Sequence, residues 1–149
     1  PIPAEERSDL MAAYYKRLTG KDRSAQVECA RAWARWEFSA ISLWPDPNQH
    51  ADIESDAFAV AFARIECHYF VNGGFFDTDD QIIRNLHKIK HIPCVLIQGR
   101  YDMCTPARTA WDIHKAWPEA DFRLVGDAGH AGSEPGIVHE LIGATDRLK

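Results

Sequence analysis

Two short apolar runs of strand length, residues 92–97 and 122–125, constrain the fold of this chain more than any other feature. The segment between them, 106–117, and the segment after them, 135–148, have the character of helices. Strand, helix, strand, helix in that order predicts a parallel pair of strands joined by a helical crossover. Because two strands alone do not make a stable sheet, we expect their neighbouring strands to come from elsewhere.

The residues before these runs show no strand pattern and predict helices instead. Apolar side chains that recur every three or four positions indicate helices. The expected helices are 3–18, one from Asp22 or Ser24 to 43, one from Asp52 or Ser55 to 70, and 79–87. We therefore expect an α/β chain in which an all-helical segment, residues 1–88, precedes a two-stranded parallel β-α-β-α segment, residues 89–149.

Composition excludes several classes of function. The formal net charge is −5 at pH 7 and the basic residues are scattered, which argues against a nucleic-acid partner. No apolar run approaches the roughly 20 residues of a membrane helix, and no leader pattern opens the chain. The four cysteines form no CxxC pair, and His87 and His91 lack a nearby third ligand. We expect a cytoplasmic protein with no metal, no cofactor and no membrane partner.

An acid and a histidine follow the two predicted strands at matching positions. Asp102 comes five residues after Ile97, and His130 comes five residues after Val125. Parallel strands end at one edge of a sheet, so the two side chains are expected to meet there. A carboxylate that keeps one imidazole nitrogen protonated lets the other nitrogen take a proton from a hydroxyl. The alternative is that Asp102 caps the next helix and His130 is an ordinary loop residue.

The nucleophile that such a pair would serve is missing from the sequence. A serine hydrolase of this architecture carries its nucleophile in a G-x-S-x-G turn ahead of the acid and the histidine. None of the serines has that context: Ser8, Ser24, Ser39, Ser42, Ser55 and Ser133. We therefore expect the isolated chain to be inactive.

Three stretches of the second half together resemble the C-terminal end of proline iminopeptidase, an α/β-hydrolase that removes N-terminal proline from peptides. They are IPCVLIQGRYD at 92–102, AWDIHKAWPEA at 110–120, and DAGH at 127–130 with EPGI at 134–137. The resemblance extends over the whole chain. It implies that Asp102 is the acid of a catalytic triad and His130 its general base. It also implies that the partners are a peptide with N-terminal proline and the N-terminal half of the hydrolase core.

The helical half resembles the cap domain of the same family. The matching stretches are WARWE at 33–37 and RIECHYFVN at 64–72. The resemblance implies that Glu37 and Glu66 correspond to the cap acids that bind the free α-amino group of the substrate. Charge-assisted hydrogen bonds from two carboxylates suit an ammonium group. The alternative is that both glutamates face solvent and pair with Arg35 or Arg64.

Two other functions remain open. Another capped α/β-hydrolase, an esterase or an epoxide hydrolase, would share the acid and the histidine but have a different cap pocket. A non-catalytic interaction module would be a stable monomer with a ligand of its own. A partial hydrolase core would instead expose unpaired strand edges and tend to self-associate, which gel filtration at several concentrations can distinguish.

Overall fold

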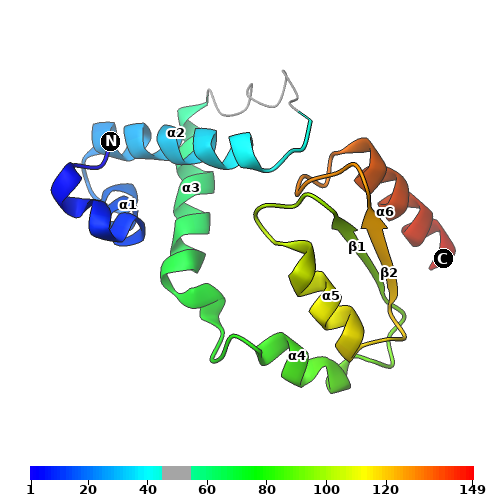
Figure 1. The fold of residues 1–149 in the computed structure, drawn as a ribbon. Coiled ribbons are helices and arrows are strands. Elements are labelled where there is room, and N and C mark those ends of the chain that lie inside the picture. Colours follow the sequence, from blue (N-terminus) through cyan, green and yellow to red (C-terminus); the bar gives the residue numbers. More distant parts are fainter. Residues whose placement is uncertain (45–54) are drawn as a thin grey trace. The chain divides into compact units, whose positions relative to one another are not determined.

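The computed structural model describes residues 1–44 and 55–149, which form two compact units (Figure 1). The first unit comprises 1–39 and 55–76, and the second comprises 40–44 and 77–149. The assignment of residues 1–88 to a cap domain and 89–149 to a hydrolase core stays a prediction. The expected helix start at Asp52 lies outside the described residues.

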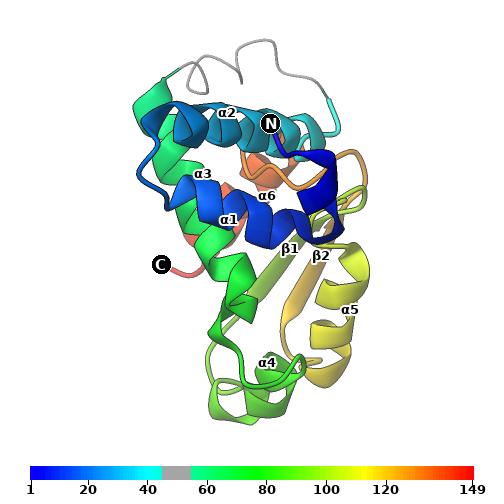
Figure 2. The same cartoon turned by 90° about the vertical axis from the view of Figure 1, so that its left-hand side faces the viewer.

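The first unit is entirely helical in its described residues. Its elements are η1 (Ala4–Asp9), α1 (Leu10–Leu18), α2 (Arg23–Ala40), α3 (Asp56–Val71) and η3 (Gly73–Phe75). Helices α1 and α3 lie side by side in Figures 1 and 2 and contact each other. Small side chains such as Ala30, Ala34 and Ala59 are fully buried between the helices, which allows close packing. Leu18 and Cys67 belong to the same core.

Local capping explains where these helices begin and end. Asp9 accepts a hydrogen bond from the backbone N–H of Ala12, so α1 starts there and the expected helix 3–18 is divided into η1 and α1. Ser55 caps α3 in the same way, through Phe58, and confirms the predicted start at Ser55. Beyond α3, Gly73 and Gly74 take φ values of 57° and 63°, which glycine adopts readily.

The second unit contains a two-stranded parallel sheet. Its elements are α4 (Gln81–Asn85), η4 (Leu86–Lys88), β1 (Val95–Gly99), α5 (Ala107–Ala116), β2 (Asp121–Val125) and α6 (Pro135–Arg147). In the strand register, Val95 lies opposite Asp121 and Gly99 opposite Val125. The predicted fold class is confirmed: the described chain is mostly helical and has one two-stranded parallel sheet. None of its helices is long and apolar enough to cross a membrane.

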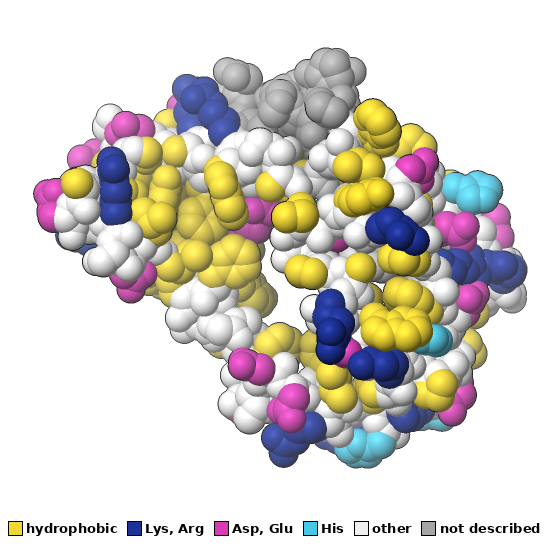
Figure 3. All heavy atoms as spheres, in the orientation of Figure 1, with side chains coloured by type: hydrophobic (Ala, Val, Ile, Leu, Met, Phe, Trp, Pro, Cys, Tyr) yellow, Lys and Arg dark blue, Asp and Glu magenta, His cyan; other side chains and the backbone are white. Residues whose placement is uncertain are grey.

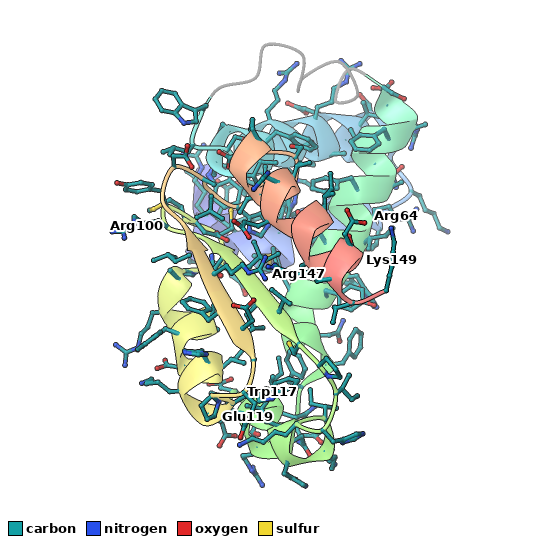
Figure 4. All side chains as sticks on the ribbon, turned by 90° about the vertical axis from the view of Figure 1, so that its right-hand side faces the viewer. Arg64, Arg100, Trp117, Glu119, Arg147 and Lys149 are labelled. Atoms are coloured by element: carbon teal, nitrogen blue, oxygen red, sulfur yellow. The ribbon has the colours of Figure 1, made fainter. Side chains whose placement is uncertain are left out.

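Helices α5 and α6 both pack against β1, through different side chains. Leu96 packs with the cluster that contains Trp117, which Figure 4 labels at the end of α5. Ile97 packs instead with Val125 and with Ile137 of α6. Because successive strand residues point to opposite faces, the two helices cover the two faces of the sheet.

The predicted strand 92–97 is wrong by about three residues, since β1 spans Val95–Gly99. Pro93 has no N–H to donate to a strand ladder. At the other end, Gln98 and Gly99 pair with β2, although neither is strongly apolar. Strand pairing, and not the apolar run, therefore fixes the limits of β1.

The second predicted helix is also longer than the observed one. Helix α2 ends at Ala40, three residues before the expected end at 43. The carbonyl of Ile41 accepts hydrogen bonds from the backbone N–H groups of His130 and Ala131 instead. Long-range hydrogen bonds have thus replaced the last helical turn.

Candidate active site

The loops that follow β1 and β2 are bonded to each other along their backbones. Arg100 donates its N–H to the carbonyl of Val125 at 2.9 Å, and Tyr101 donates to the carbonyl of Ala128 at 3.0 Å. These bonds continue the strand pairing past the end of the sheet. They hold the loop that carries Asp102 beside the loop that carries His130.

Asp102 and His130 come together at this edge. Nδ1 of His130 lies 3.0 Å from Oδ2 of Asp102, within hydrogen-bond distance. The side chain of Asp102 is 6% exposed, whereas that of His130 is 37% exposed. The carboxylate is therefore buried, and the imidazole remains accessible to a reacting group.

The surroundings of Asp102 favour its ionised form. Burial by itself raises the pKa of this carboxyl. The hydrogen bonds that it accepts from the Thr105 backbone and hydroxyl, from His130 and from Gln98 outweigh burial, so the pKa of Asp102 is lowered below its usual value. An ionised carboxylate only accepts hydrogen bonds, so Nδ1 of His130 carries the shared proton. Nε2 is then left as the proton acceptor.

Asp102 also caps the turn that leads to α5. Its Oδ1 accepts hydrogen bonds from the backbone N–H groups of Cys104 at 3.0 Å and Thr105 at 2.7 Å. Helix α5 itself has Pro106 as its N-cap and no side-chain cap, so the alternative that Asp102 caps this helix is wrong. Asp102 holds the turn before the helix through Oδ1 and contacts His130 through Oδ2.

Glu134 anchors the loop that carries His130, a role that sequence reasoning missed. Its side chain is buried, and Oε1 accepts the backbone N–H of Gly129 at 2.7 Å. The same oxygen lies 3.4 Å from the backbone nitrogen of Leu43. Position 43 is far away in the sequence, so no local pattern could have shown this contact.

Replacing Glu134 by Ala is expected to lower the free energy of unfolding by about 1 to 3 kcal/mol, because it leaves the buried N–H of Gly129 without an acceptor. Urea unfolding of the chain measures the change. Glu134→Gln is the matched control, since an amide oxygen can accept the same hydrogen bond. Equal stability of Glu134→Ala and the unsubstituted chain would contradict the anchoring role.

Cys104 is a second residue whose place the sequence did not indicate. In the structure, potential metal-ligand atoms of Asp102, Cys104 and His130 all lie within 4.8 Å of one another. This is the one such cluster of three found in the described residues, and it contains neither His87 nor His91. The one feature of the sequence that could have indicated this position is that Cys104 lies two residues after Asp102, in the same loop.

Glu37 and Glu66, the two glutamates predicted to bind an amine, lie in the first unit, and the structure gives Glu66 a specific partner. Glu66, on α3, accepts a hydrogen bond from Nε1 of Trp33 at 2.5 Å. Trp33 and Glu37 are one turn apart on α2 and so share a face. Both glutamates are half-buried, and Glu66 bonds Trp33 and not Arg64.

An apolar pocket of about 300 Å³ lies in the same unit. It is lined by Leu10, Met11, Tyr14, Trp33, Trp36 and Phe70. Figure 3 shows hydrophobic side chains gathered below α2, beside α1 and α3. Because Trp33 both lines the pocket and bonds Glu66, one wall of the apolar space is tied to a carboxylate.

The chain is homologous to proline iminopeptidases over almost its whole length. It is 52% identical to the "Probable proline iminopeptidase" of Leptolyngbya boryana over 99% of this chain and 46% of that protein. It is 50% identical to the proline iminopeptidase of Arabidopsis thaliana, over 99% of this chain and 39% of that protein. It is 47% identical to the proline iminopeptidase of Xanthomonas citri, over 97% of this chain and 46% of that protein. The chain thus spans less than half the length of these relatives. No family model matches the sequence.

Proposed function

We propose that this homologue of the proline iminopeptidases supplies the acid, the general base and the amine-binding carboxylates of an enzyme that releases N-terminal proline from peptides. The hydrogen bond between buried Asp102 and accessible His130 is the observation that carries the proposal. The relatives that are 52% and 50% identical to this chain bear the name of that activity.

In this proposal Asp102 orients His130 and stabilises its protonated form. Nε2 of His130 removes the proton from a serine hydroxyl outside this chain as that oxygen attacks the carbonyl of the proline residue. The imidazolium then gives the proton to the departing amine, which leaves a prolyl ester on the serine. Water, deprotonated by the same imidazole, releases proline and restores the serine.

Glu37 and Glu66 are proposed to bind the α-ammonium group of the N-terminal proline. An exopeptidase must recognise this charge, and carboxylates do so through strong charge-assisted hydrogen bonds. The neighbouring apolar pocket suits a pyrrolidine ring, because its carbon atoms are apolar and only its nitrogen carries a charge. A capped esterase or epoxide hydrolase would keep Asp102 and His130 but would not need an ammonium site.

The remainder of the hydrolase core is the proposed partner of the second unit. In the described part of the chain each of the two strands has one unpaired edge. Helix α6 also exposes apolar side chains, among them Leu141 at 43% and Ile142 at 56%. Without that partner we expect an inactive, self-associating chain. None of the four cysteines forms a disulfide, which is consistent with the proposed cytoplasmic location.

A chimera tests the function. In it, this chain replaces the aligned segment of the Xanthomonas citri proline iminopeptidase, to which it is 47% identical. We expect the chimera to hydrolyse prolyl 4-nitroanilide faster than N-acetylprolyl 4-nitroanilide or an acetate ester. A folded chimera that hydrolyses only the ester would support the capped esterase instead.

Replacing Glu66 by Gln in the chimera is expected to lower kcat/KM for prolyl 4-nitroanilide by about 10- to 100-fold, because a charged hydrogen bond to the ammonium group is lost. The small rate for the N-acetylated substrate should not change. Glu28→Gln, on an exposed position of α2, is the matched control and should leave both rates unaltered. Unchanged discrimination in Glu66→Gln would argue against the amine-binding role.

A further inference from the structure

We propose that Asp102, Cys104 and His130 form a binding site for a soft divalent cation such as Zn²⁺. A carboxylate, a thiol and an imidazole each offer one ligand atom, and the three atoms lie within 4.8 Å of one another. All three residues belong to the loops that follow β1 and β2, which backbone hydrogen bonds hold together. The site is therefore largely assembled by the fold itself.

The distances fit a tetrahedral zinc site after a small movement. Zinc binds sulfur at about 2.3 Å and nitrogen or oxygen at about 2.0 to 2.2 Å, which sets neighbouring ligand atoms about 3.3 to 3.7 Å apart. Oδ2 of Asp102 and Nδ1 of His130 are 3.0 Å apart, slightly closer than this, so the two side chains move apart on binding. Cys104 is exposed, and its side chain can change rotamer to adjust the position of the sulfur. Water completes the fourth position, as in other three-ligand sites.

The donor set selects the kind of cation. A thiolate and an imidazole favour zinc and cadmium, whereas magnesium and calcium prefer oxygen ligands alone. Gln98 and Thr105 donate hydrogen bonds to Asp102 and hold its carboxylate in place, as outer residues do in metal sites. On binding, the Cys104 thiol releases its proton to solvent. The proton on Nδ1 of His130 moves to Nε2 through solvent, so that Nδ1 can bind the metal, and no electron is transferred.

A cation bound here would occupy the imidazole and the carboxylate at once. If the proposed function is correct, zinc would therefore inhibit the assembled enzyme by blocking proton transfer at His130. This consequence rests on the proposed function, whereas binding itself does not and can be measured on the isolated chain.

Calorimetric titration of the reduced 149-residue chain with ZnCl₂ tests the site, and the ultraviolet thiolate-to-metal absorption on adding CdCl₂ identifies the sulfur ligand. We expect one zinc per chain and no binding of MgCl₂. Cys104→Ser and His130→Ala should each weaken zinc binding at least about tenfold. Cys94→Ala is the matched control, since Cys94 precedes β1 and lies outside the cluster; it should bind zinc normally.

Circular dichroism verifies that each variant is folded before its titration is compared. Zinc binding that is equally strong in folded Cys104→Ser would overturn the proposal, as would the absence of binding to the unsubstituted chain at submillimolar zinc. A cadmium absorption band that disappears in Cys94→Ala but persists in Cys104→Ser would place the thiolate ligand elsewhere and also overturn it.

Discussion

Replacing His130 by Ala in the chimera is expected to reduce kcat for prolyl 4-nitroanilide by about 10⁴-fold or more. The reason is geometric, because the accessible imidazole of His130 lies with its Nδ1 3.0 Å from Oδ2 of the buried Asp102 carboxylate. Without the imidazole, nothing removes the proton from the serine hydroxyl, and formation of the acyl-enzyme stops. Stopped-flow release of 4-nitroaniline measures this first step directly.

His139→Ala is the matched control, because His139 is an exposed histidine of α6 in the same unit. It should retain the full rate of the chimera. Circular dichroism should show that both variants keep the fold, since the backbone bonds of position 130 to Ile41 do not involve the imidazole. A folded His130→Ala chimera with more than a tenth of the original rate would contradict the assignment of the base.

Replacing Gly99 by Ala is expected to destabilise the chain by about 3 kcal/mol or more, the upper range for overpacking. A Cβ atom at position 99 would lie 1.9 Å from the carbonyl oxygen of Gly129 and 2.8 Å from that of Ala128. Both are backbone atoms of the His130 loop, which Glu134 also holds in place. The crowding cannot be relieved by rotating a side chain. Urea unfolding followed by tryptophan fluorescence measures the loss.

Gly126→Ala is the matched control for Gly99→Ala, because it adds the same methyl group at another glycine. A Cβ atom at position 126 would have no neighbour within 4 Å, and Gly126 does not adopt a positive φ. Its unfolding free energy should change by no more than about 0.5 kcal/mol. If Gly99→Ala proves as stable as Gly126→Ala, the close approach of the two loops is not as described.

Sequence reasoning succeeded where the determinants are local. Ser55, one of the two expected starts of the third helix, lies before a regular apolar pattern and caps α3. The positions of Asp102 and His130 after two successive strands predicted that they would meet, because parallel strands end at one edge. Neither inference required knowledge of contacts between distant segments.

Sequence reasoning failed where distant segments decide the structure. The end of α2 at Ala40 depends on hydrogen bonds between Ile41 and the His130 loop. The extension of β1 to Gly99 depends on pairing with β2. Glu134 is buried through its contacts with Gly129 and Leu43, for which the sequence offered no signal. Such contacts leave no periodic pattern in the sequence.

In our proposal this chain carries the acid and the base of a proline-releasing hydrolase, and the nucleophile comes from outside the 149 residues. The most direct test is the release of 4-nitroaniline from prolyl 4-nitroanilide by the isolated chain, measured beside the chimera under the same conditions. We expect turnover by the chimera and none above the buffer rate by the isolated chain. Turnover by the isolated chain that disappears in His130→Ala would contradict this proposal.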